Sequence, residues 1–130
     1  MNLAVLAPIL ALSTALAPQA RWQEIGKTST GNAVLLDPKS VKKAPDGIIT
    51  ATLRVKFVKP IATPKGPITA SRTVAMFDCA KKLVAVKENT YFHDEAKNSV
   101  YEKSVPVKPG YGTTIKGSLP DVAMGHLCTK

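Results

Sequence analysis

The chain has 130 residues, with 18 Lys and Arg against 9 Asp and Glu, and a net charge of +9. This length predicts one small domain, and an aromatic content of 5% leaves Val, Ile, Leu and Ala to form its core. Lysine outnumbers arginine 15 to 3. This balance favours a solvated basic surface that attracts acidic macromolecules. It argues against a nucleic-acid-binding protein, because such proteins use bidentate arginine contacts and aromatic side chains interleaved with the basic residues.

The first 20 residues contain no charged side chain, and residues 3–17 are almost wholly apolar. This run is shorter than the roughly 20 residues that a transmembrane helix needs. We therefore predict a secretory signal peptide over residues 1–20, cleaved after Ala17 or after Ala20. The mature domain, residues 21–130, is then exported and carries no transmembrane span.

Cys79 and Cys128 are the only cysteines of the chain. In an oxidising compartment an isolated pair of this kind forms one disulfide. Their wide spacing differs from the C-x-x-C arrangement of redox-active pairs. The bond would close a loop of about 50 residues, for which the chain-entropy model gives roughly 4 kcal/mol of stabilisation.

The N-terminal half reads as a hairpin, a turn and a long strand. Residues 22–26 and 33–37 form two short strands around a polar turn. Asp37 then caps a helical turn that has proline at its first position. Residues 49–57 alternate apolar and polar side chains without a break, which predicts a β-strand with one buried face and one wet face.

Three further strands are expected after a proline-rich exposed loop over residues 60–67. They cover residues 68–79, 83–92 and 99–103. Simple alternation in the middle strand places Val84, Val86 and Phe92 on one face. Residues 106–117 contain two prolines and three glycines and are expected to be irregular.

The period of the pattern changes at the C-terminal end. Apolar side chains and His126 recur at helical spacing, with Ser118 as the N-cap and Asp121 completing a box-like cap. Gly125 weakens this short helix, so the disulfide would attach it to the strand that ends at Cys79. The predicted fold is α+β, an antiparallel β-sheet of five to six strands with one C-terminal α-helix packed on a face.

Short motifs along the whole mature chain resemble the surface-adhesin protein E family of Gram-negative bacteria. They are the Trp22–Gly26 strand, Leu36-Asp37-Pro38 with Ser40-Val41, Ser71-Arg72, Phe77-Asp78-Cys79, Pro109-Gly110, and Leu127-Cys128. The resemblance implies an exported domain in the periplasm or at the cell surface, with an antiparallel sheet and a disulfide-attached helix. It also implies an adhesin-like binding role.

The residue pattern predicts no catalytic residues, no metal ligands and no cofactor. His93 lies beside two acidic neighbours in a polar turn, where adjacent side chains point to water. His126 lies on the apolar helix face, which favours a core histidine. Neither histidine joins a spacing typical of a zinc site.

The anion-binding candidates are five basic residues: Arg54, Lys56, Lys59, Lys42 and Lys43. The first two share the wet face of the clearest strand. We therefore expect a non-enzymatic exported binding module that contacts an acidic macromolecule (a host matrix protein, a polysaccharide or a lipid headgroup) through this face or through the proline-rich loop. The alternative is a periplasmic structural or inhibitory domain that docks on an envelope enzyme with residues 106–117.

Overall fold

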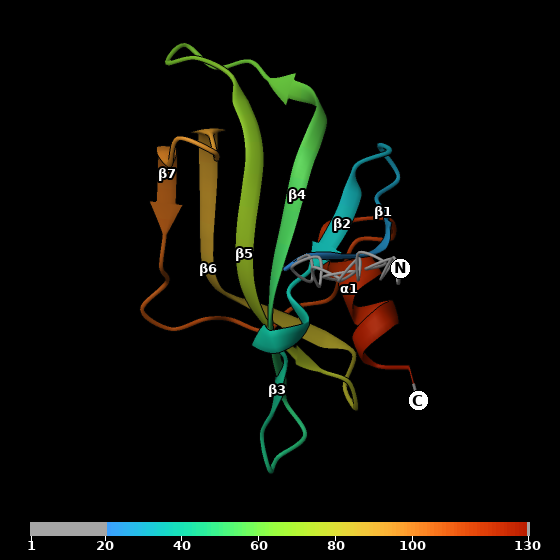
Figure 1. Ribbon diagram of the computed structural model, residues 1–130. Coiled ribbons are helices and arrows are strands. Elements are labelled where there is room, and N and C mark those ends of the chain that lie inside the picture. The colour runs from blue at the N-terminus through green and yellow to red at the C-terminus, as the bar shows by residue number, and fades with distance from the viewer. Residues whose placement is uncertain (1–20, 130) are drawn as a thin grey trace, which may run out of the picture.

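The computed structural model describes residues 21–129, so the predicted signal peptide and its two cleavage sites lie outside the described residues. Seven antiparallel strands form one sheet in the order β1-β2-β4-β5-β6-β7, with the short β3 paired to the start of β4 (Figure 1). The strands are β1 (Gln23–Lys27), β2 (Ala33–Leu36), β3 (Lys42–Lys43), β4 (Ile49–Ile61), β5 (Ile68–Asp78), β6 (Leu83–Asp94) and β7 (Ser99–Ser104).

Two helical elements accompany the sheet. A 3-10 turn, η1 (Pro38–Ser40), connects β2 to β3, and the helix α1 (Leu119–Leu127) follows a long loop after β7. Asp37 caps η1, since its carboxylate accepts a hydrogen bond from the Lys39 amide at 3.2 Å. The predicted α+β architecture is confirmed, with two additions: the two-residue β3 was not expected, and β4 continues into the predicted proline-rich loop as far as Ile61.

The core lies between one face of the sheet and α1. Along β4 the predicted alternation holds, because every second residue is buried on this face while Thr50, Thr52 and Arg54 point the other way. Leu53 on β4 and Phe77 on β5 are both fully buried. The same cluster contains Val34, Leu36, Ile49, Ala51, Val55, Ala75, Val84, Ala123 and Met124.

A β-bulge interrupts the alternation of β6. Val86 lies opposite Ala75 of β5 and Glu88 lies opposite Val74, which leaves Lys87 as an extra residue. An extra residue reverses which side chains point to each face in the rest of the strand. The bulge therefore divides β6 into two segments of opposite phase.

The bulge overturns one expectation from the sequence. Phe92 lies opposite Ala70, on the face away from α1, so the prediction that it shares a face with Val84 and Val86 is wrong. Asn89 and Tyr91 take the α1 side instead, because they lie opposite Thr73 and Ser71. Two polar side chains thereby enter a face that simple alternation would leave apolar.

The helix α1 begins as predicted, and the apolar residues of its predicted face pack on the core, whereas His126 does not. The Ser118 side chain accepts a hydrogen bond from the Asp121 amide at 3.4 Å. Ala123 and Met124 are the buried residues of the helix, and His126 is exposed. Two residues advance an α-helix by about 200°, so burial of Met124 directs His126 to solvent. The expectation of a core histidine is therefore wrong.

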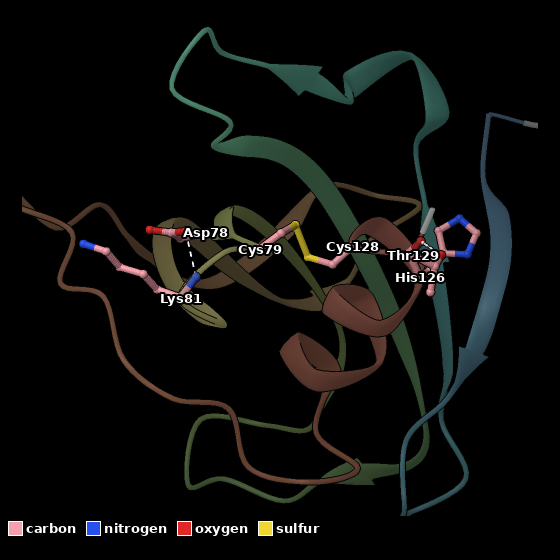
Figure 2. Close-up of a disulfide and its surroundings, with 6 residues drawn as sticks. All are labelled: Asp78, Cys79, Lys81, His126, Cys128 and Thr129. Carbon is pink, nitrogen blue, oxygen red and sulfur yellow. Dashed lines mark hydrogen bonds between the residues drawn. A yellow bond between two sulfur atoms is a disulfide. The ribbon is translucent and has the colours of Figure 1, made fainter.

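The disulfide joins Cys79, just after β5, to Cys128, the C-cap residue of α1 (Figure 2). The two Cα atoms are 5.4 Å apart, and the cysteines are separated by 49 residues in sequence. The predicted pairing is confirmed. It attaches the far end of the helix to the end of the sheet where Phe77 is buried.

Candidate functional site

The β4–β5 hairpin extends beyond the rest of the sheet. We call residues 56–67 the hairpin tip. The last pairing of β4 with β2 joins Val55 to Val34, so the tip has no strand on that side, and it stands clear of β1 and β2 in Figure 1. The tip also exposes apolar surface, since Val58 is 70% exposed and Ile61 is 45% exposed.

Three lysines of the hairpin tip are available to an outside partner. Lys56, Lys59 and Lys65 are all exposed. Within residues 21–129 the four ion pairs involve Arg21, Arg54, Arg72 and Lys103, so none of the three tip lysines is neutralised by a neighbouring carboxylate there. Each therefore presents an unpaired basic side chain to solvent.

Contacts with β6 and β7 brace the base of the hairpin tip. The His93 Nδ1 atom hydrogen-bonds to the Pro67 carbonyl at 2.7 Å. The His93 ring packs edge-on against Tyr101 with 5.2 Å between ring centroids. The turn itself is closed by the Gly66 amide, which donates to the Thr63 carbonyl at 3.0 Å. His93 thus has a structural role, and the expectation that it points to water is wrong.

The free edge of β4 at the tip is closed to further strand pairing. The Val58 amide donates to the Asn32 Oδ1 atom at 2.9 Å, and Pro60 has no amide hydrogen to offer. An edge protected in this way resists pairing with another chain. Beside it lies an open cavity of about 540 Å³, lined by Thr30, Asn32, Phe57, Val58, Lys59 and Ile61. The tip therefore offers side chains, and not backbone, to a partner.

Arg54, one of the predicted anion-binding residues, lies in a polar cluster on the face away from α1. It forms an ion pair with Glu95, and Arg72 pairs with the other oxygen of the same carboxylate at 3.3 Å. The side chain of Glu95 is only 11% exposed, and that of Arg54 23%. The Arg54 guanidinium is thus paired with Glu95 within the protein and is largely shielded from solvent.

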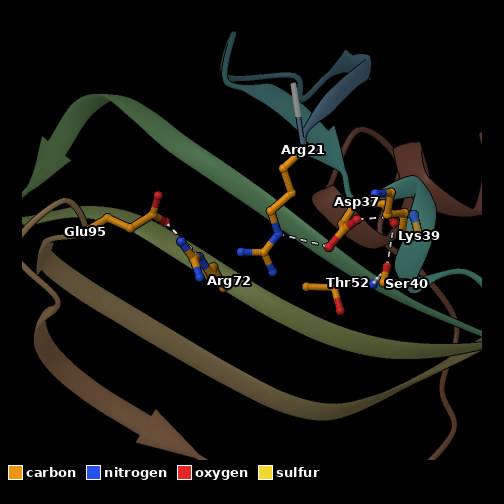
Figure 3. Close-up of polar contacts among 7 residues, drawn as sticks. All are labelled: Arg21, Asp37, Lys39, Ser40, Thr52, Arg72 and Glu95. Atoms are coloured by element: carbon orange, nitrogen blue, oxygen red, sulfur yellow. Dashed lines mark hydrogen bonds and ion pairs between the residues drawn. The ribbon is translucent and has the colours of Figure 1, made fainter. Parts of the chain in front are cut away.

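The same cluster collects every arginine of the chain around its single tryptophan. The guanidinium carbons of Arg21, Arg54 and Arg72 lie 4.8, 5.8 and 5.5 Å from the Trp22 ring centroid. Arg21 also pairs with Asp37 at 3.0 Å, as Figure 3 shows. Stacking of this kind stabilises partly buried guanidinium groups. No local pattern in the sequence predicts this cluster, because its ion pairs join residues that are 16 to 41 positions apart.

Lys42 and Lys43 lie far from the other predicted anion-binding residues. They form β3, opposite Thr50 and Ile49 at the beginning of β4, whereas Lys59 lies near its end. Nine residues of strand separate Thr50 from Lys59, which corresponds to roughly 30 Å. The structure therefore places Lys56 and Lys59 on the hairpin tip, three positions apart in β4, and leaves Lys42 and Lys43 at the opposite end of the sheet (Figure 1).

The part of the chain that the structure describes was compared with two kinds of site, a metal centre and a membrane-spanning helix. No group of three or more His, Cys, Asp or Glu side chains within residues 21–129 is placed to hold a metal ion. No helix in this part of the chain is both long enough and apolar enough to cross a membrane. The described part of the chain is thus a small disulfide-bonded sheet with a braced hairpin that presents unpaired lysines.

Comparison with known proteins identifies the family. Residues 22–129 match the sequence model of the family described as surface-adhesin protein E, and the chain belongs to this family. No curated protein sequence matches the chain. Family membership indicates an exported, adhesin-like surface protein.

Solved structures of Haemophilus influenzae protein E share the fold. The selenomethionine form is 12% identical with a TM-score of 0.56, over 86% of this chain and 88% of that chain. Crystal form II is 13% identical with a TM-score of 0.52, over 86% and 87%. The protein from non-typeable Haemophilus influenzae is 12% identical with a TM-score of 0.54, over 90% and 81%.

Proposed function

We propose that this protein is an adhesin-like module that contacts an acidic macromolecule through the hairpin tip. The observation that carries the proposal is the position of Lys56, Lys59 and Lys65, which are exposed and have no carboxylate partner among the described residues. Their charges stand beside the exposed side chains of Val58 and Ile61. A partner that combines acidic groups with some apolar surface fits this combination.

The braced geometry supports the same proposal. A surface whose backbone is already held in place loses less conformational entropy when a partner binds. His93 and Gly66 hold the hairpin tip, and Asn32 fixes the free edge of β4. The tip can therefore act as a preformed contact surface, in contrast to the Arg54 cluster, whose charges are turned towards Glu95.

The test measures binding to heparin, a sulfated polysaccharide, as a function of salt. The triple variant Lys56→Glu, Lys59→Glu, Lys65→Glu is expected to weaken binding at least about tenfold, because three attractive contacts become repulsive. Binding by the unmodified protein is expected to fall steeply between low and physiological ionic strength.

A matched control separates the tip from net charge. The variant Lys42→Glu, Lys43→Glu, Lys81→Glu changes the total charge by the same amount at the other end of the sheet. It should bind heparin within about twofold of the unmodified protein, since exposed charges more than a Debye length away are screened. Equal losses in both triple variants, or binding that does not respond to salt, would overturn the proposal.

A second candidate function rests on the loop between β7 and α1. Val107 is 98% exposed and Ile115 is 80% exposed, an unusual presentation of branched apolar side chains. They flank Gly112, whose amide and carbonyl both hydrogen-bond to Val84 at 2.9 Å. A loop fixed at its centre, with apolar side chains on each side, suits insertion into the cleft of an envelope enzyme in the periplasm.

The two functions make opposite demands on location and partner. Protease treatment of intact cells should degrade the protein if the hairpin tip serves adhesion at the surface. A protected periplasmic pool, together with stoichiometric capture of an envelope hydrolase that Val107→Asp and Ile115→Asp abolish, would favour the inhibitory alternative. Capture that persists in this double variant would remove the loop from consideration.

A further inference from the structure

An open groove lies on the α1 side of the sheet, beside the N-terminal end of the helix. Its volume is about 510 Å³, within the range of roughly 300–1,000 Å³ typical of small-molecule sites. The floor comes from β4, β5 and β6, one wall from the β1–β2 loop, and the other from the start of α1. The lining residues are Thr28, Ser29, Thr30, Asn32, Val55, Phe57, Ser71, Thr73, Val86, Asn89, Tyr91, Ser118, Leu119 and Pro120.

The walls of the groove are fixed to each other. The Ser29 amide donates to the Gly117 carbonyl at 2.9 Å, which joins the β1–β2 loop to the residue before the N-cap. Gly117 has φ +80°, and a Cβ atom there would lie 2.8 Å from the Ser29 Cβ. Only glycine allows so close an approach in this conformation. The two walls of the groove are therefore held in a fixed position relative to each other.

The floor of the groove combines aromatic rings with polar groups. The bulge at Lys87 turns Asn89 and Tyr91 to this side of the sheet. The Thr73 hydroxyl donates to the Asn89 Oδ1 atom at 2.7 Å, which leaves the two amide hydrogens of the Asn89 side chain free to act as donors. Phe57 and Tyr91 contribute ring surface. Apolar area with a few placed hydrogen-bonding groups is characteristic of a ligand site.

The groove contains no charged side chain among its fourteen lining residues. This absence is notable in a chain with a net charge of +9, and it contrasts with the lysines of the hairpin tip. A groove without charge cannot pair with an ionic ligand, and burying an unpaired ionic group in it would be unfavourable. Hydroxyl and carboxamide groups beside aromatic rings instead match a ligand that has many hydroxyls and apolar C–H faces.

We propose that this groove binds an uncharged saccharide, with Tyr91 stacking against a sugar ring and Asn89 donating to a ring or acetamido oxygen. The site borders the hairpin tip at Phe57 but involves none of its three lysines. Binding here is expected to be insensitive to salt, whereas binding of heparin at the tip is expected to be strongly salt-dependent. The two proposals can therefore fail independently.

The experiment is saturation-transfer NMR with the neutral disaccharide N-acetyllactosamine, compared with its sialylated form. The unmodified protein should give saturable transfer that does not change with salt, and the sialylated form should bind no more tightly. Tyr91→Ala should weaken binding at least about fivefold through loss of stacking, and Tyr91→Phe should retain the ring contact. Asn89→Ala should also weaken binding.

The tip variant Lys56→Glu, Lys59→Glu, Lys65→Glu serves as the control and should bind N-acetyllactosamine like the unmodified protein. Circular dichroism and thermal melting establish whether each variant is folded. If Tyr91→Ala does not fold, the pair Tyr91→Phe and Asn89→Ala tests the site in its place. Three outcomes would overturn the proposal. They are no saturation by N-acetyllactosamine up to about 10 mM, transfer unchanged in both Asn89→Ala and Tyr91→Ala, and tighter binding of the sialylated form than of the neutral disaccharide.

Discussion

The two ends of the sheet differ in what covers them, although the same strands run through both. At one end α1 packs on β1, β2 and β4, Leu53 and Phe77 are fully buried, and the disulfide attaches the helix. At the other end the hairpin tip projects without a covering element, and Val58 is 70% exposed. Buried apolar side chains are thus concentrated at one end of the sheet, and exposed side chains at the other.

The side chains along β5 show the same division. Under the helix its inward residues are Ala75 and Phe77, whereas beyond the helix they are Ser71 and Thr73. A polar side chain beneath a helix would need a buried hydrogen-bond partner. Ser71 and Thr73 are themselves buried at the floor of the groove, and the Thr73 hydroxyl meets this need by donating to the Asn89 Oδ1 atom. The change from apolar to polar residues along one strand marks the boundary between core and contact surface.

Removal of the disulfide should have the largest effect on the covered end. The double variant Cys79→Ala, Cys128→Ala is expected to lose roughly 4 kcal/mol of unfolding free energy, because the unfolded chain regains the entropy of an open loop. Urea denaturation measures the loss directly. A loss below about 1 kcal/mol would show that packing alone holds α1 in place.

Truncation of core side chains should distinguish the two ends next. Leu53→Ala is expected to cost about 3 kcal/mol through lost burial and the cavity left behind. Val58→Ala, five residues along the same strand but exposed, should change stability by less than about 0.5 kcal/mol. Comparable losses for both variants in chemical denaturation would contradict the division of the sheet that the structure shows.

The polar cluster on the opposite face should contribute an intermediate amount. Glu95→Gln removes the carboxylate that Arg54 and Arg72 share and should cost about 2 kcal/mol, since hydrogen bonds to charged groups are lost. Glu102→Gln, on the exposed surface of β7, is the matched control and should have little effect. Thermal melting of the two variants under the same conditions gives the comparison.

The smallest of these effects is expected at the wall of the groove. Gly117→Ala places a Cβ atom in a left-handed conformation against Ser29 and should cost about 1.5 kcal/mol. Gly110→Ala, in the same loop region with nothing within 4 Å, should be almost neutral. Differential scanning calorimetry resolves the difference, and equal melting temperatures would show that the two walls are not tightly joined.

Local patterns in the sequence were sufficient for much of the covered end. The alternation of β4, the caps at Asp37 and Ser118, and the pairing of Cys79 with Cys128 were all predicted and are confirmed. Each depends on residues that are neighbours in sequence or on a pair with no competing partner. Such signals are read directly because strand period, cap chemistry and cysteine count are local properties or simple counts.

The binding surfaces depended on contacts that no local pattern records. A single extra residue in β6 brought Asn89 and Tyr91 into the groove, and a shared carboxylate at Glu95 withdrew Arg54 from the predicted basic face. The sequence by itself determined the strands, the caps and the disulfide, because these follow from chemistry within a few residues or from a unique pair. Only the tertiary structure decided which lysines stay unpaired and where the helix leaves the sheet uncovered, because both depend on residues that meet only after the chain folds.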